Sequence, residues 1–159
     1  MAVYSAAGRT TATAATANHA VFQFWNPDAA QRVLLLETGF YWAGAPPAGS
    51  PGFYMVRTTT IGTAAAVVTP DADNAWDRQD VPPSGATIRL GAFSVQPTLA
   101  TPQLFGHTSA AVAGQNGTGY VWVFGHAPLT VPPGTGVAVV QRISNATPIS
   151  EVYVVFEEN

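Results

Sequence analysis

Short runs of apolar residues that alternate with polar ones recur along the chain and predict β-strands. Residues 19–26 (HAVFQFWN) alternate in this way and stop at the turn signal Asn-Pro-Asp. Residues 32–44 form a longer apolar run, in which Thr38-Gly39 predicts a bulge or bend. Residues 53–70 are rich in β-branched side chains. Further strands are expected within residues 86–95, 120–125, 129–143 and 149–158.

Helices are not expected, because 13 prolines and 15 glycines divide the chain into short segments without a 3.6-residue apolar period. Residues 70–85 predict a polar loop, and residues 96–119 predict a long irregular connection. Seven to nine short strands joined by turn-rich loops predict an all-β fold, an antiparallel two-sheet sandwich closed by Greek-key connections. We favour a jelly roll, with an immunoglobulin-like or fibronectin-like sandwich as the alternative. The sandwich is expected to be one domain, residues 19–159, and residues 1–18 an extended N-terminal arm.

Composition indicates a protein that associates with others. The 159 residues are 47% hydrophobic and only 9% charged, so much of the surface must be uncharged, and we expect part of it to be buried in an oligomer or larger assembly. There is no lysine, and the arginines are scattered singly in a chain of net charge −3, which argues against nucleic-acid binding. Neither a secretory signal nor an apolar run long enough for a membrane span is found, so we expect synthesis in the cytoplasm.

Residue types needed for catalysis or metal binding do not occur in useful patterns. There is no cysteine, no serine lies in a G-x-S-x-G elbow, and His19, His107 and His126 have no metal-site spacing. Glu37 lies in an apolar run and is expected to point outward or to pair with an arginine. The acidic loop at residues 70–80 does not fit an EF-hand, so a solvated loop capped by Trp76 is expected. These observations predict no enzyme activity, no cofactor and no metal.

The C-terminal third carries a resemblance to a protein family. The segment LTVPPGTGVAVVQ (129–141), the closing VYVVFEE (152–158) and the opening MAVYSAAGRTTATAAT before the first aromatic strand together resemble small jelly-roll head decoration, or cement, proteins of phages and prophages. The similarity is one of layout over most of the chain. It implies a capsid decoration protein, expected on the exterior of a virion, that binds the major capsid protein and itself as a homotrimer.

The resemblance also implies a role for the N-terminal arm. A tract of Ala and Thr cannot bury enough surface to fold alone, but its backbone can add to the edge of another subunit. On this hypothesis the arm orders only on assembly and straps the protein to its neighbours. The residues expected to bind the capsid or another subunit are Val3, Tyr4, Arg9, Thr10, Thr11, Thr13 and Thr16.

A binding module is the alternative function. Trp76 lies in a polar loop, whereas the other three tryptophans lie in predicted strands, where a core or interface location is expected. A tail- or fibre-associated sandwich could recognise a cell-surface glycan through Trp76 and the connection at residues 96–119, which contains His107. The sequence alone leaves this alternative open.

Overall fold

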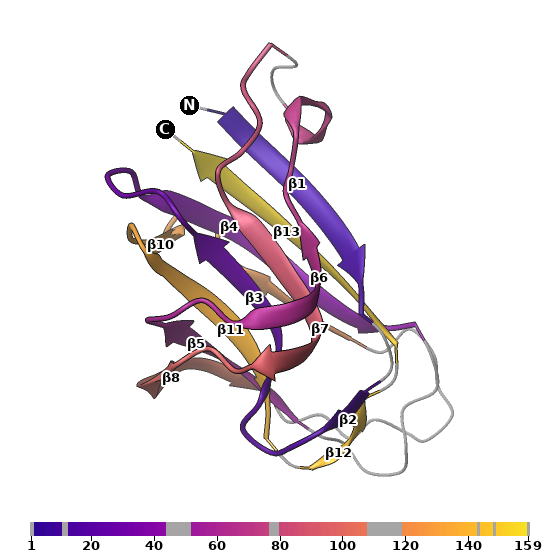
Figure 1. Cartoon of the computed structure of the whole chain (residues 1–159). Coiled ribbons are helices and arrows are strands. Elements are labelled where there is room, and N and C mark those ends of the chain that lie inside the picture. The colour runs from indigo at the N-terminus through magenta and orange to yellow at the C-terminus, as the bar shows by residue number, and fades with distance from the viewer. Residues whose placement is uncertain are drawn as a thin grey trace.

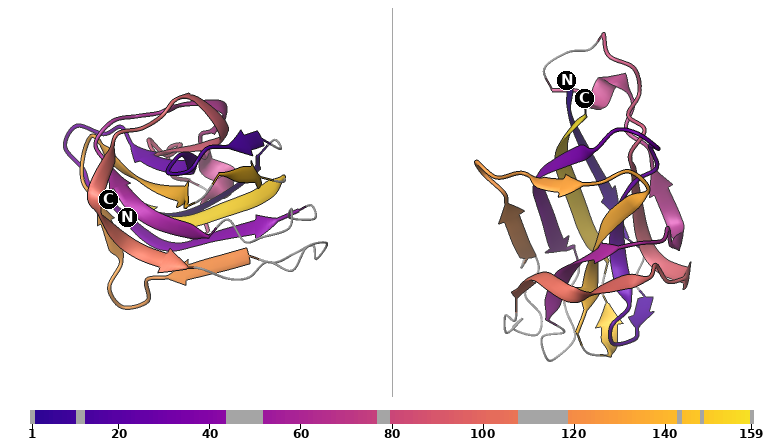
Figure 2. Two further views of the ribbon diagram at one scale, coloured as in Figure 1. Left: turned by 90° about the horizontal axis from the view of Figure 1, so that it is seen from below. Right: turned by 90° about the vertical axis from the view of Figure 1, so that its left-hand side faces the viewer.

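Two antiparallel sheets stacked face to face carry most of the chain (Figures 1 and 2). The computed structural model describes residues 2–10, 13–43, 52–76, 80–107, 119–142, 144–147 and 149–158. The first sheet contains β1 (Ala2–Arg9), β13 (Ser150–Glu158) and β4 (Val33–Trp42), followed by β9 (Gly119–Val123) and β10 (Leu129–Val131), which both pair with β4. The second sheet contains, in spatial order, β6 (Thr63–Val68), β7 (Thr87–Val95), β3 (Ala20–Asn26), β11 (Thr135–Gln141), β5 (Phe53–Thr58) and β8 (Leu99–His107).

Two small elements complete the described structure. Strands β2 (Thr13–Ala15) and β12 (Asn145–Thr147) pair with each other, and η1 (Ala72–Asn74) is a single 3-10 turn. The all-β fold and the antiparallel two-sheet sandwich predicted from the sequence are thereby confirmed.

The main strand pairs are nested along the chain. Strand β1 pairs with β13, β3 with β11, β4 with β9 and β10, and β5 with β8, all antiparallel. The hairpin β6–β7 is inserted between β5 and β8 and extends the second sheet beyond β3. Each pair therefore joins segments that are distant in sequence, and the innermost pair is β5 with β8.

Aromatic side chains fill the space between the sheets. Phe24 of the second sheet packs on Phe156 of the first at 4.9 Å between ring centroids, and Phe53 packs on Phe40 at 4.7 Å. All four rings are at most 1% exposed. The alternation of apolar residues seen in the sequence places these rings on the inner face of each sheet.

Residues 53–70 form two strands rather than one, because a buried side chain holds the turn between them. Gln23 is fully buried; its amide nitrogen donates to Thr58 Oγ1 (2.8 Å) and to the Thr60 carbonyl (2.9 Å). Its amide oxygen accepts from the Gly62 N–H at 2.9 Å. The chain turns here, so that β5 and β6 lie at separate positions in the second sheet. The predicted irregular connection at 96–119 is also partly wrong, since it contains β8, which pairs with β5.

The N-terminal residues differ most from the expectation. Residues 2–9 are β1, which pairs along its whole length with β13, and Figure 1 shows the two strands side by side. Tyr4 is only 2% exposed, stacks on Phe156 at 5.5 Å, and donates from its hydroxyl to the Pro82 carbonyl at 2.7 Å. These residues therefore belong to the sandwich, and the expectation of an arm outside it is wrong for them. The Ala/Thr composition predicts too little burial for folding, but the Tyr4 ring provides a contact with the core.

Candidate binding face

The outward faces of the two sheets are unlike each other. On the second sheet, outward residues of β3, β5 and β11 form a small buried cluster of Ala20, Tyr54, Val56, Ala138 and Val140, each at most 6% exposed. Phe93, Leu99 and Ala100, at the β7–β8 crossover, pack against this cluster. The central strands of the second sheet are therefore covered on both sides by the chain itself.

In the part of the chain that the structure describes, no comparable buried cluster lies on the outward face of the first sheet. Strand register places on it alternate residues of β1, β13, β4 and β9: Val3, Ser5, Ala7, Glu157, Val155, Tyr153, Glu37, Gly39, Tyr41, Val121 and Val123. We call this surface the open face. Val121 is 41% exposed and Val123 is 66% exposed. Apart from Glu37 and Glu157, its charges are the paired Arg9 and Glu151 at its edge.

A β-bulge sets the direction of the Glu37 side chain. Val155 pairs with Glu37 and Phe156 with Leu35, so Leu36 is an extra residue in β4. In a regular strand Glu37 would share the inward side of Leu35; the bulge turns it to the open face instead. The predicted bulge at Thr38-Gly39 is thus found two residues earlier. The expected outward orientation of Glu37 is confirmed, and its hydrogen-bond partner is a tyrosine rather than an arginine.

That partner is Tyr153, whose hydroxyl donates to Oε1 of Glu37. The Tyr153 ring lies over Gly39 and stacks on Tyr41, with 6.2 Å between ring centroids and 13° between ring planes. Partial burial, and then the Glu37 carboxylate, raise the pKa of Tyr153 well above its usual value. The phenol is protonated at neutral pH, as a tyrosine ordinarily is, and the raised pKa keeps it a donor to Glu37 at more alkaline pH.

Trp76 closes one side of a shallow hollow on the open face. Its backbone N–H donates to the Val3 carbonyl at 2.7 Å, and its indole Nε1 donates to Ser5 Oγ. The side chain nevertheless remains 66% exposed. The hollow has a volume of about 340 Å³, and its lining includes Ser5, Glu37, Asn74, Trp76, Tyr153 and Val155. An exposed indole fixed beside a carboxylate can contact a ligand by stacking and by charge together.

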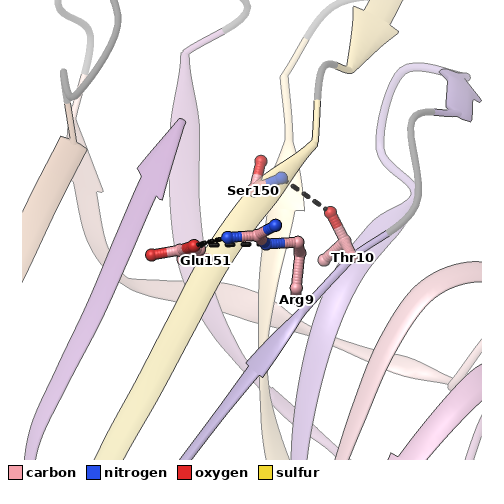
Figure 3. A network of polar contacts seen from close by, with 4 residues as sticks. All are labelled: Arg9, Thr10, Ser150 and Glu151. Carbon is pink, nitrogen blue, oxygen red and sulfur yellow. Dashed lines mark hydrogen bonds and ion pairs between the residues drawn. The ribbon is translucent and has the colours of Figure 1, made fainter. Parts of the chain in front are cut away.

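The residues predicted to form a binding arm lie within the fold where the structure describes them (Figure 3). Arg9 forms an exposed ion pair with Glu151, and the hydroxyl of buried Thr10 accepts from the Ser150 N–H at 3.0 Å. Thr13 pairs through its backbone with Thr147 in β2–β12. Thr16 is exposed and its carbonyl accepts from the His19 N–H at 3.2 Å. Thr11 lies outside the described residues.

The two residues of the glycan hypothesis are not brought together. Trp76 contacts Val3. Val3 pairs with Glu157 of β13, and Glu157 pairs with Leu34 near the start of β4. His107 pairs with Phe53, whose ring packs on Trp42 at the other end of β4. The two residues therefore lie at opposite ends of the sandwich. The side chain of His107 lies outside the described part of the chain.

The acidic loop is organised by its own hydrogen bonds. The Asp71 carboxylate accepts from the Asp73 N–H at 3.0 Å, and the Asn74 side chain accepts from the Asp71 N–H at 3.0 Å, which together cap η1. Among the described residues no group of three or more His, Asp or Glu side chains is placed to hold a metal ion. The same residues include no helix of the length and hydrophobicity needed to cross a bilayer.

Comparisons with protein-family models, with curated proteins and with solved structures find no match to this chain. The open face and its hollow are therefore interpreted from their own geometry. Sequence reasoning singled out Trp76 but missed Tyr153 and the open face, which depend on the register between β4 and β13.

Proposed function

We propose that this protein is a structural component of a virus particle, a decoration or cement protein that binds the assembled head shell as a homotrimer and stabilises it. The observation that carries the proposal is the contrast between the two outward faces. One sheet is covered by the chain, while the open face offers small apolar, aromatic and few charged side chains. Depletion of charge together with exposed aromatic residues is typical of surfaces that other proteins cover.

The jelly-roll interpretation is part of the proposal. The four nested antiparallel pairs, with β9 and β10 counted as one interrupted strand and β6–β7 as an insertion, support it. In this order the chain alternates between the two sheets as a doubled Greek key does. The topology agrees with the resemblance to decoration proteins, and it is compatible with other functions of the same fold.

The proposed mechanism needs no chemical step. A protein that binds only the assembled shell stabilises that state by its binding free energy, so stabilisation grows with the concentration of free protein above its dissociation constant. Burial of a face with few charged side chains requires little desolvation of charged groups, which favours such binding.

Quantitative mass spectrometry of density-purified particles tests the proposal. We expect a copy number that is a simple fraction of that of the major capsid protein. A few copies per particle would place the protein in a tail, portal or fibre, and its absence would reject the proposal.

A matched pair of variants tests the role of the open face. Val123→Glu places a charge on that face, and Val95→Glu places one at a similarly exposed valine of the second sheet (66% and 58% exposed). We expect only Val123→Glu to weaken shell binding. Equal binding by both variants would show that the open face is not the contact surface.

Glycan binding is the second candidate function, and fewer residues support it than the sequence suggested. Only the exposed Trp76 beside Glu37 supports it, because His107 lies at the other end of the sandwich. Binding to a glycan array that is lost in Trp76→Ala would favour this candidate.

A further inference from the structure

We propose that the hollow beside Trp76 binds a cationic side chain, an arginine or a lysine, presented by a protein partner. The inference rests on the proposed function in one respect, since that function supplies the protein partner. The chemistry of the site can be tested without that partner.

The aromatic wall of the hollow is held in place before any ligand arrives. Two hydrogen bonds from Trp76 to β1, one from its backbone to Val3 and one from its indole to Ser5, hold the ring in place. Ala75, the preceding residue, is buried and bridges to Tyr4. A large apolar ring that is fixed yet 66% exposed can receive a ligand without losing much side-chain freedom.

The carboxylate wall is equally fixed. The bulge at Leu36 turns Glu37 outward, and the Tyr153 hydroxyl donates to one of its carboxylate oxygens. The Tyr153 ring is itself confined by Gly39 below and Tyr41 beside it. A carboxylate can accept several hydrogen bonds, so Glu37 can accept from an ammonium or guanidinium group while it holds the tyrosine.

The charge around the hollow is negative among the described residues. Glu37 is the charged residue in its lining, Asp71 and Asp73 precede Trp76 in the adjoining loop, and Glu157 lies on the same face. Arg9 is already paired with Glu151. A cation is attracted by the indole ring, by the Glu37 carboxylate and by the surrounding negative charge. An anionic ligand is repelled by this charge, and a neutral sugar can only stack on the ring and form hydrogen bonds.

The hollow also suits a single side chain in size. A volume of about 340 Å³ lies at the low end of the roughly 300–1,000 Å³ range of small-molecule pockets. Its lining includes Val155 and Ala7, which offer apolar contact to the methylene groups of a long basic side chain.

Nuclear magnetic resonance titration with N-acetylarginine amide tests the inference on the full chain. The probe should shift the indole N–H signal of Trp76 with an affinity on the order of millimolar, and added salt should weaken it. The neutral, unbranched N-acetylnorleucine amide should leave the signal in place. Equal shifts by the two probes would overturn the assignment of a cation site.

Three variants define the contribution of each group. Glu37→Gln should weaken arginine binding about five- to tenfold. Trp76→Ala should remove it, which is followed through the backbone N–H signal of Ser5 because this variant has no indole signal. Glu157→Gln, which removes the same charge from the same face outside the hollow, should change it less than about twofold. Equal losses of arginine affinity in Glu37→Gln and Glu157→Gln would mean that arginine is attracted by the negative charge of the face in general and not by this hollow, which would overturn the proposal.

Two other occupants are distinguishable outcomes. If methyl glucoside shifts Trp76 and Glu37→Gln does not weaken arginine binding, the hollow is a sugar site. Arg78 follows Trp76 by two residues and lies outside the described residues. If arginine binds to the Arg78→Ala variant but not to the unaltered protein, the Arg78 side chain is the occupant of the hollow. Either outcome would reject the inference.

The particle experiment separates this inference from the proposed function. Arginine binding by a protein that is absent from particles would keep the cation site and reject the decoration function. A protein present at a simple fraction of the capsid protein, without arginine binding, would keep the function and reject the site.

Discussion

The Tyr153 ring lies directly on the backbone of Gly39, so that a Cβ on Gly39 would overlap Cε1 of the tyrosine. This contact between neighbouring strands lets the ring lie flat on the sheet and brings its hydroxyl to Glu37. An aromatic ring that covers a strand glycine also shields an otherwise exposed backbone. The flat placement of the Tyr153 ring on the open face therefore requires a glycine at position 39.

Substitution Gly39→Ala should destabilise the protein by about 1–3 kcal/mol, because the added methyl group must displace the Tyr153 ring. Chemical denaturation measures the loss. Gly85→Ala is the matched control, since a Cβ there meets nothing within 4 Å and should change stability by less than about 1 kcal/mol. In a Tyr153→Ala background Gly39→Ala should cost much less; an unchanged cost would mean that the ring is not the obstacle.

Alkaline pH should destabilise the protein in part through Tyr153. Burial and Glu37 raise the pKa of Tyr153 in the folded state, so the folded state keeps this proton more tightly than the unfolded chain. The resulting stabilisation is complete below the unfolded pKa of about 10 and is lost as pH rises above it. Urea denaturation between pH 8 and pH 11 should show a shallower decline for Tyr153→Phe. The same decline in both proteins would contradict this prediction.

Removal of the Tyr4 ring should destabilise the sandwich by about 3–5 kcal/mol, since it leaves a cavity beside Phe156. Thermal unfolding of Tyr4→Ala measures the effect. Val3→Ala, the next residue on the opposite side of β1, should cost less than about 1 kcal/mol. If both variants retained full stability, β1 would behave as the detachable arm that the sequence suggested.

Two adjacent residues at the end of β1 should differ in importance. The ion pair of Arg9 with Glu151 is exposed, so Arg9→Ala should cost less than about 1 kcal/mol. Thr10→Val removes the acceptor of a buried N–H and should cost about 1–3 kcal/mol. Denaturation curves for the two variants check the order, and a larger loss for Arg9→Ala would reverse it.

Sequence patterns were sufficient for the fold class, because short apolar runs with partial alternation, as in β4 and β13, mark strands that have one side in the core. They were insufficient for β1, where alternate small residues give a weak pattern and a single ring, that of Tyr4, supplies most of the burial. They also misplaced the bulge in β4 by two residues. The bulge depends on how β4 aligns with β13, more than a hundred residues away, and no local pattern records that alignment.

The pairing of β1 with β13 has a consequence for synthesis of the protein. A ribosome releases β1 long before it makes residues 150–158, so β1 stays unpaired during most of synthesis. Its pairing with β13 closes the longest loop among the nested strand pairs. The open face spans both strands and cannot form before residues 150–158 have been made. On the proposed function, assembly would therefore accept only subunits in which β13 has been made and paired, because a chain without β13 lacks part of the surface that binds.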